Sequence, residues 1–90
     1  MNLKFFIDPA THELHIFNHG VTEEEASEIV MDPIEDQRSR NNTRIARGKT
    51  ENGRFIRVVY AEKTTSIVVI TAWVMTGKEL QAFKRRNKHQ

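Results

Sequence analysis

Cationic side chains and a few proton-transfer groups are the residues of this chain whose types suit chemistry on a phosphodiester. Five cations follow one another along one stretch of the sequence: Arg44, Arg47, Lys49, Arg54 and Arg57. Guanidinium groups could stabilise a pentacovalent phosphorane, and His19 or Tyr60 could move protons, since imidazole titrates near neutrality. This set is sufficient for metal-independent RNA cleavage. It is not specific to that reaction, because most basic domains contain as many such residues.

The alternation of side chains along a strand decides which of these cations can act together. Arg47 and Arg44 point to opposite sides of the first predicted strand of this stretch. On the return strand Arg54 shares a side with Tyr60, and Arg57 lies on the other. A face with several guanidinium groups beside a tyrosine could bind phosphates and stack a base. The alternative is a solvated face whose cations protect a sheet edge, and residue types leave both readings open.

Three histidines share one stripe of a predicted helix, because His12, His15 and His19 are spaced i, i+3, i+7. A metal would need a further ligand such as Asp8 or Glu13, and no recognised zinc spacing is present. We therefore expect exposed helix histidines, no metal site and no cofactor. The chain also has no cysteine, which excludes disulfides and thiolate metal sites.

The acidic and basic residues are divided between two parts of the sequence. Residues 1–36 carry nine carboxylates and one lysine, a net charge of −8, and residues 37–90 carry a net +10. A basic half indicates a polyanionic partner, which an acidic half could orient. Alternatively, the charges interleave once the chain folds. No apolar run approaches the ~20 residues of a membrane span and no leader pattern is present, so we expect a cytoplasmic protein.

Residues 1–90 are expected to form one domain that begins with a short apolar run and two helices. Leu3–Ile7 reads as a short strand or an extended lead-in, and Asp8-Pro9 opens a helix to about residue 18. Thr22 and Glu25 form a capping box for a second helix that stops before Asp32-Pro33. The polar residues 35–42 are predicted to be an exposed loop.

The second half of the sequence changes to the period of strands. Thr43–Thr50 leads into Asn52-Gly53, which predicts a type I′ turn, and Arg54–Ala61 is the return strand. Residues 62–65 make a second turn, and Ser66–Trp73 reads as a strand buried in the middle of a sheet.

The C-terminal segment predicts a last helix that starts with a second capping box. Thr76 and Glu79 form this box, Leu80 and Phe83 anchor the helix, and residues 85–90 are expected to fray. The whole order predicts an α+β fold: N-terminal helices followed by a curled antiparallel β-meander and a C-terminal helix, with the helices on one face.

Three segments, in the same order, resemble the BrnT-type toxins. Residues 19–26 followed by Asp32-Pro33 resemble their "HGV-(S/T)-x-EEA … DP" stretch, and Gly48–Arg54 resembles their "G-x-T-x-x-GR" hairpin. Residues 69–76 resemble their "(I/V)-(I/L)-S-A-R-x-(A/M)-T" junction of strand and helix. Related small domains of unknown function share the hairpin and the final strand.

The resemblance implies a RelE/ParE-like fold and a type II toxin. Such a toxin is a ribonuclease that cleaves mRNA and is neutralised by a cognate antitoxin. The expected partners are that antitoxin, RNA, operator DNA only through the antitoxin complex, and a possible second copy of the chain, but no membrane. His19, Arg44, Arg54 and the strand-end position of Trp73 match family positions associated with the site.

The family usually has arginine where this chain has Trp73, which could remove about 2–4 kcal/mol of transition-state stabilisation. The tryptophan could pack in the core or offer a stacking platform. The alternative to a toxin-like ribonuclease is therefore a weakened or inactive module of the same fold that binds nucleic acid or protein. The predicted catalytic residues are His19, Arg44, Arg54 and Tyr60. The predicted nucleic-acid-binding residues are Arg47, Lys49, Arg57, Trp73 and Lys78.

Overall fold

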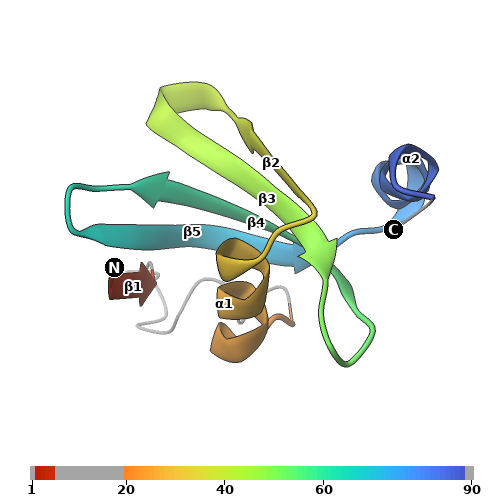
Figure 1. Ribbon diagram of the computed structural model, residues 1–90, viewed down its shortest axis with the longest axis horizontal. Helices are drawn as coiled ribbons and strands as arrows, with labels where there is room; N and C mark the ends of the chain where they lie inside the picture. The colour runs from red at the N-terminus through yellow and green to blue at the C-terminus, as the bar shows by residue number, and fades with distance from the viewer. Residues whose placement is uncertain (1, 6–19, 89–90) are drawn as a thin grey trace.

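The computed structural model describes residues 2–5 and 20–88 as a five-stranded mixed sheet with two α-helices (Figure 1). The elements along the chain are β1 (Asn2–Phe5), α1 (Glu23–Met31), β2 (Glu35–Arg38), a 3₁₀ turn (Arg40–Asn42), β3 (Thr43–Lys49), β4 (Phe55–Glu62), β5 (Ser66–Val74) and α2 (Gly77–Arg86). The strand order is β1-β5-β4-β3-β2. The predicted α+β class is confirmed. The helix predicted from Asp8-Pro9 lies outside the described residues.

The sheet is larger than the predicted three-stranded meander. Strands β2 to β5 form an antiparallel meander of four, and β1 is added parallel to β5 at the far edge. Residues 35–42 were expected to be a loop, but Glu35–Arg38 pairs with β3 from Glu35↔Arg47 to Arg38↔Arg44. The sequence Glu-Asp-Gln-Arg has no apolar residue that could indicate a strand. A charged edge strand is nevertheless common, because it discourages pairing with other chains.

Helix α1 forms where the sequence predicted it. The amide of Glu25 donates to Thr22 Oγ1 at 3.1 Å and the amide of Thr22 donates to Glu25 Oε1 at 3.1 Å, which confirms the capping box. The helix ends at Met31, before Asp32-Pro33. Its buried residues lie against the sheet at Gly48, where an added Cβ would come within 3.1 Å of Ile29 Cδ1. Glycine therefore lets the helix approach the strand closely.

The core lies between α1 and one face of the sheet. On β4 this face presents Ile56, Val58 and Tyr60, all buried. The pairing of β4 with β5 shifts between Val59 and Tyr60, because Val59 pairs with Thr71 and Tyr60 with Val69. The bulge allows both Val69 and Ala72 to be buried although they are three residues apart. Burial along β5 therefore does not alternate strictly, and its sequence reads as a nearly continuous apolar run without a period of two.

The β3–β4 turn differs from the predicted type I′ turn, which needs positive φ at both Asn52 and Gly53. Gly53 has φ 89°, but among the described non-glycine residues only Asn41 and Asn42 have positive φ. The amide of Gly53 donates to the Thr50 carbonyl at 2.9 Å. The turn is therefore a longer loop with one left-handed glycine.

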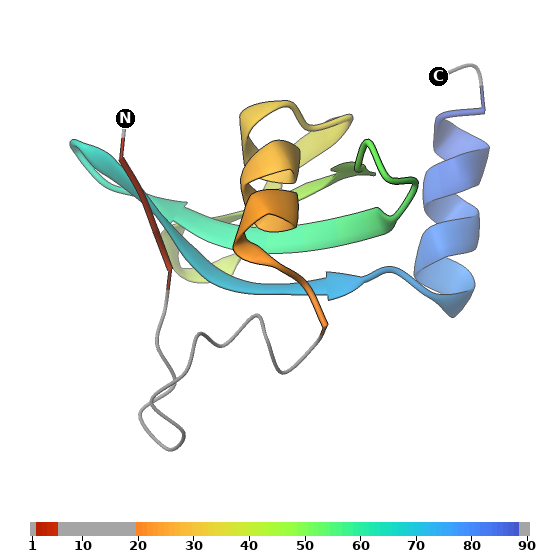
Figure 2. The same ribbon diagram turned by 90° about the horizontal axis from the view of Figure 1, so that it is seen from below.

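Helix α2 lies at the end of the sheet (Figure 2). Its Glu79 contacts Arg47 and Arg57 on the face that α1 does not cover. The prediction that the helices share one face is therefore wrong. Thr76 is the N-cap residue, as predicted, but its side chain makes no capping hydrogen bond. The second capping box is therefore wrong, because Glu79 is hydrogen-bonded to the sheet instead. The expected fraying is also absent at Arg86 and Asn87, which donate to Glu35.

Candidate nucleic-acid interface

Arg54, a predicted catalytic residue, holds the β3–β4 turn against the start of α1. Its Nη1 donates to both carboxylate oxygens of Glu25 at 2.9 and 3.0 Å, and its Nη2 donates to the Gly20 carbonyl at 3.0 Å. Glu25 is only 6% exposed. Burial acts to raise the pKa of Glu25, but the hydrogen bonds from Thr22 and Asn52 and the charge of Arg54 together outweigh it and lower that pKa. Arg54 is thus neutralised by a buried carboxylate and has a structural role.

Arg44 and Tyr60 meet at the opposite end of the sheet, around Asp36. Arg44 Nε donates to Asp36 Oδ1 at 2.9 Å, and the Tyr60 hydroxyl donates to Asp36 Oδ2 at 2.6 Å. Burial and the hydrogen bond to Asp36 raise the pKa of Tyr60 to about 12. The phenol therefore keeps its proton at neutral pH, and its hydrogen bond orients the carboxylate that holds Arg44.

Arg47, Arg57 and Trp73 form a row on the other face, because they pair directly across β3, β4 and β5. Both arginines donate to the same oxygen of Glu79, at 2.9 Å from Arg47 Nε and 3.1 Å from Arg57 Nη1. The guanidinium of Arg57 lies 4.5 Å from the ring centroid of Trp73, a cation–π contact. Trp73 is half-buried and supports this guanidinium, so it is neither a core residue nor an open stacking platform.

The predicted catalytic residues that the structure describes do not form one cluster. Arg44 and Tyr60 are neighbours, but Arg54, the residue before β4, precedes Tyr60 by six positions, about 20 Å at the usual rise of a strand. His19 lies outside the described residues. Of the predicted nucleic-acid ligands, Lys49 and Lys78 are exposed near α2, at the end of the sheet away from Arg44.

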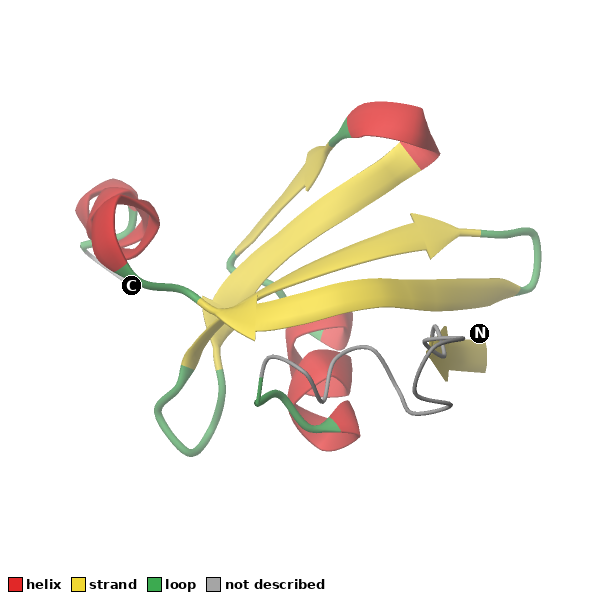
Figure 3. Ribbon diagram, turned by 180° about the vertical axis from the view of Figure 1, so that it is seen from behind, coloured by secondary structure: helices red, strands yellow, loops and turns green. Residues whose placement is uncertain are grey.

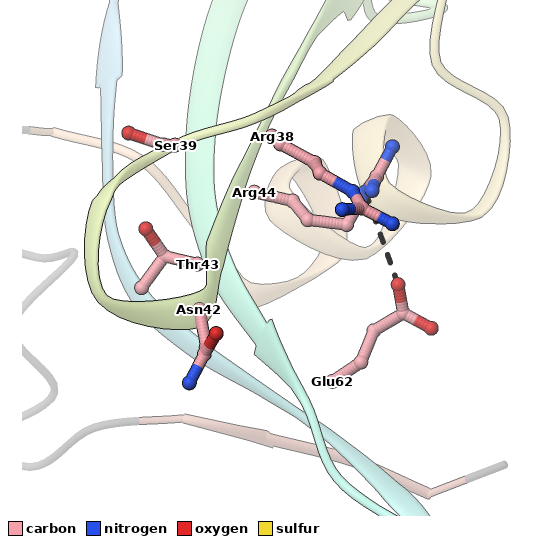
Figure 4. Close-up of a pocket in the computed structure, with 6 residues that line it drawn as sticks. All are labelled: Arg38, Ser39, Asn42, Thr43, Arg44 and Glu62. Carbon is pink, nitrogen blue, oxygen red and sulfur yellow. Dashed lines mark ion pairs between the residues drawn. The ribbon is translucent and has the colours of Figure 1, made fainter.

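A polar hollow of about 410 Å³ lies at the end of the sheet where β2 turns into β3 (Figure 4). Its lining residues are Arg38, Ser39, Asn42, Thr43, Arg44 and Glu62. We call it the guanidinium hollow. Arg38 and Arg44 pair across β2 and β3, and Figure 4 shows their guanidinium groups side by side. Glu62 Oε1 lies 3.8 Å from Arg44 Nε, which is a long ion pair. Arg38 has no carboxylate partner among the described residues.

Most residues of this hollow were not in the predicted site, because strand β2, which pairs with β3, was not predicted. A usable signal was present in Ser39-Arg40-Asn41-Asn42. Asparagine tolerates the left-handed conformation, and Asn41 and Asn42 adopt φ of 58° and 61°. A tight turn at this point would have placed Arg38 opposite Arg44.

The charge split of the sequence largely disappears in the fold. Three carboxylates of the acidic segment pair with arginines of the basic segment: Glu25 with Arg54, Glu35 with Arg86 and Asp36 with Arg44. The charges of the described residues therefore interleave. The cations that retain no carboxylate partner in this part of the chain include Arg38 at one end of the sheet and Lys49 at the other.

Comparison with known families places α1 and strands β2 to β5 within one domain type. A family model described as a domain of unknown function, DUF4258, matches residues 14–74, more than half of the chain. The chain belongs to the DUF4258 family. No curated protein and no solved structure matches it significantly. The DUF4258 match includes every residue of the guanidinium hollow and ends at the last residue of β5.

Two further properties of the described residues bear on the chemistry of this DUF4258 domain. These residues contain no group of three or more histidine, aspartate or glutamate side chains that could hold a metal ion. His12 and His15, which were considered as ligands, lie outside these residues. No helix in the same part of the chain has the length and apolar character needed to cross a membrane.

Proposed function

We propose that this chain is a nucleic-acid-binding module of RelE/ParE-like fold whose guanidinium hollow contacts the phosphate backbone of RNA. The observation that carries the proposal is the pairing of Arg38 with Arg44 across two strands, with Arg38 free of any carboxylate partner in the described residues. Like charges directly opposite each other destabilise a sheet. A bound phosphate removes that repulsion, because it accepts charge-assisted hydrogen bonds from both guanidinium groups.

The surroundings of the two arginines suit a phosphodiester. Ser39 and Asn42 line the hollow and supply neutral donors of the kind that contact phosphate and sugar oxygens. Arg40 and Lys63 are exposed at the same end of the sheet and extend the positive surface. Asp36 keeps Arg44 in place from one side of its guanidinium, which leaves other donors of the fork for a ligand.

The surroundings of the predicted catalytic residues favour binding over efficient cleavage. Arg54 is neutralised by Glu25, and Arg47 and Arg57 share Glu79. Tyr60 holds its proton too tightly to act as a base at neutral pH. An antitoxin-regulated ribonuclease is the second candidate, because the sequence resemblance favours it. The arginine that the BrnT-type toxins usually have at this position is replaced here by Trp73, whose ring lies against Arg57.

The test is the binding of a fluorescein-labelled, 12-nucleotide oligouridine, followed by fluorescence anisotropy at low salt. Arg38→Gln should weaken binding about tenfold, the effect of one lost charge-assisted contact of ~1.4 kcal/mol. Arg85→Gln removes the same charge from an exposed position on α2 and should change the affinity less than twofold. Equal losses of affinity in the two variants would show that binding depends on net charge alone, and the proposal would fail.

The same samples separate binding from cleavage. After incubation, the oligouridine and a folded mRNA are examined on a denaturing gel, and both should stay intact. Cleavage that disappears in Arg44→Gln would establish the ribonuclease in place of the binding module. Cleavage that appears only in Trp73→Arg would show that the tryptophan is what weakened the reaction.

A further inference from the structure

A second hollow, of about 420 Å³, lies between α2 and the β3–β4 hairpin. Figure 3 shows that α2 and the 3₁₀ turn beside the guanidinium hollow lie at opposite ends of the sheet. The apolar walls of this second hollow, which we call the α2 groove, are Ile34, Phe55 and Phe83. The two rings stand edge to face, with centroids 6.1 Å apart at 69°. Ile34 is 39% exposed, which is unusual for a large apolar side chain of this fold.

Three lysines surround these apolar walls: Lys49, Lys84 and Lys88. All are exposed, none has a carboxylate partner among the described residues, and no carboxylate lines the groove. Lys49 Nζ and Lys84 Nζ lie 5.4 and 4.8 Å from the centroid of the Phe55 ring. The ring thus holds two ammonium groups beside an apolar surface. The arginines nearby, Arg47 and Arg86, are by contrast already paired.

The groove is held in shape by contacts that do not use its own charges. Arg86 donates to Glu35 at 2.7 and 2.8 Å, and Asn87 donates to the same carboxylate at 2.7 Å. These bonds fix the C-terminal end of α2 against β2, with Lys84 in the last turn of the helix and Lys88 just beyond it. A ligand would therefore meet a preformed surface, and binding would cost little ordering of the protein.

We propose that the α2 groove binds an acidic peptide segment of a protein partner. One apolar side chain of the peptide enters between Ile34, Phe55 and Phe83, and flanking carboxylates contact the lysines. Charge complementarity carries this choice, since the groove is lined by three cations and no anion. A nucleic acid fits less well, because stacking a base on Phe55 would compete with the two ammonium groups that the ring already holds. The inference uses residues separate from the guanidinium hollow and does not rest on RNA binding.

The probe is a fluorescein-labelled nine-residue peptide of aspartate and glutamate with one central leucine. Its binding is followed by anisotropy and located by amide shifts of the ¹⁵N-labelled protein. Shifts should cluster at β3, β4 and α2. The exposed double substitution Lys84→Ser with Lys88→Ser should weaken binding at least tenfold, and a peptide with serine in place of leucine should bind about tenfold more weakly. The matched control, Lys63→Ser with Lys78→Ser, removes the same charge elsewhere and should change the affinity less than twofold.

Four results would overturn the inference. One is the absence of peptide binding by a protein whose amide spectrum is that of the folded domain, and another is an equal loss of affinity in the control variant. The third is tighter binding of the oligouridine with shifts at the same amides, which would make the groove a nucleic-acid site. The fourth is self-association, measured by sedimentation, that the Lys84→Ser and Lys88→Ser variant abolishes, since the occupant would then be a second copy. Failure of the Arg38→Gln test would affect none of these results.

Discussion

The two ends of the sheet carry positive charge of different kinds. The guanidinium hollow is polar throughout and pairs Arg38 with Arg44 beside a turn that contains two left-handed asparagines. The α2 groove places three lysines around two phenylalanine rings. An arginine fork can contact two oxygens of one anion at once, whereas a lysine is a compact, strongly hydrated point charge without that planar geometry. The comparison teaches that one basic domain can carry two cationic surfaces of different chemistry.

Other arginines of the β3–β4 hairpin are already paired with carboxylates. Arg54 with Glu25 and the pair Arg47 and Arg57 with Glu79 connect the hairpin to the two helices. These arginines were predicted to be site residues, but their ion pairs hold the two helices against the sheet. A surface for a ligand is better sought where at least one cation lacks a carboxylate partner, as Arg38 does beside the paired Arg44.

The largest expected effect is on stability and comes from Arg54→Met. Removing the guanidinium leaves the buried Glu25 carboxylate without its cation, and we expect a loss of about 2 kcal/mol in the free energy of unfolding, less than for a fully buried pair because Arg54 is 37% exposed. Urea unfolding at pH 7 measures it. Oligouridine and peptide affinities of the folded variant should be unchanged. A variant with normal stability but no RNA binding would return Arg54 to the site and break the distinction between paired and free cations.

The pH dependence of stability sharpens this first prediction. The pKa of Glu25 is lowered in the folded state, so its contribution is present above the unfolded value near 4.5 and is lost as the pH falls through the folded pKa. Arg54→Met should raise that folded pKa and reduce the part of the acid-induced loss that comes from Glu25. Unfolding curves between about pH 3 and 6 test this. An unchanged pH profile would show that the hydrogen bonds from Thr22 and Asn52, and not the Arg54 charge, lower the pKa of Glu25.

The next effect is on salt dependence, which should differ between the two ends. If the hollow and its neighbours contact two or three phosphates, the affinity for oligouridine should fall about tenfold between roughly 50 and 200 mM salt. Arg38→Gln should reduce the logarithmic slope by about 0.7. Peptide binding should depend less on salt, because burial of the leucine is not screened. Parallel slopes for the two ligands would remove the contrast drawn between arginine and lysine surfaces.

The sequence predicted the elements whose signals are local. The capping box of Thr22 and Glu25 and the alternation of Arg44 and Arg47 needed only neighbouring residues, and both are present in the structure. Strand β2 was missed because its burial is slight and its residues are polar, so no period of two was visible. The second capping box failed because Glu79 found two arginines on the sheet, a tertiary competitor that no local pattern contains.

The candidate site was harder to predict than the fold. Cation types were visible, but their partners lie 8 to 51 residues away, as in Arg44 with Asp36 and Arg86 with Glu35. Only the folded register shows which cations are neutralised. The α2 groove was invisible for a similar reason, since the contact between Phe55 and Phe83, which are distant in the sequence, depends on how α2 docks on the hairpin.

A smaller effect is expected from Tyr60, the only tyrosine of the chain. Its absorbance should titrate near pH 12 in the folded protein and near 10 when unfolded. Because the folded pKa is raised, its contribution to stability is complete below about pH 10 and is lost as the pH rises toward 12. Tyr60→Phe should cost about 1 kcal/mol, the value of one hydrogen bond. Ionisation of the folded protein near pH 10 would contradict the contact with Asp36.

The smallest effect should come from Glu35→Gln, and it should be confined to the α2 end. Hydrogen bonds from Arg86, with burial opposing them, lower the pKa of Glu35, and the amide of glutamine keeps the shape but loses the charge. We expect faster hydrogen exchange in α2 and two- to threefold weaker binding of the acidic peptide, with oligouridine binding unchanged. Glu62→Gln, at the other end of the sheet, is the matched control and should leave α2 exchange as it is. If both substitutions loosened α2 equally, the two ends could not be treated as independent surfaces, because a change beside Arg44 would then reach the groove through the sheet.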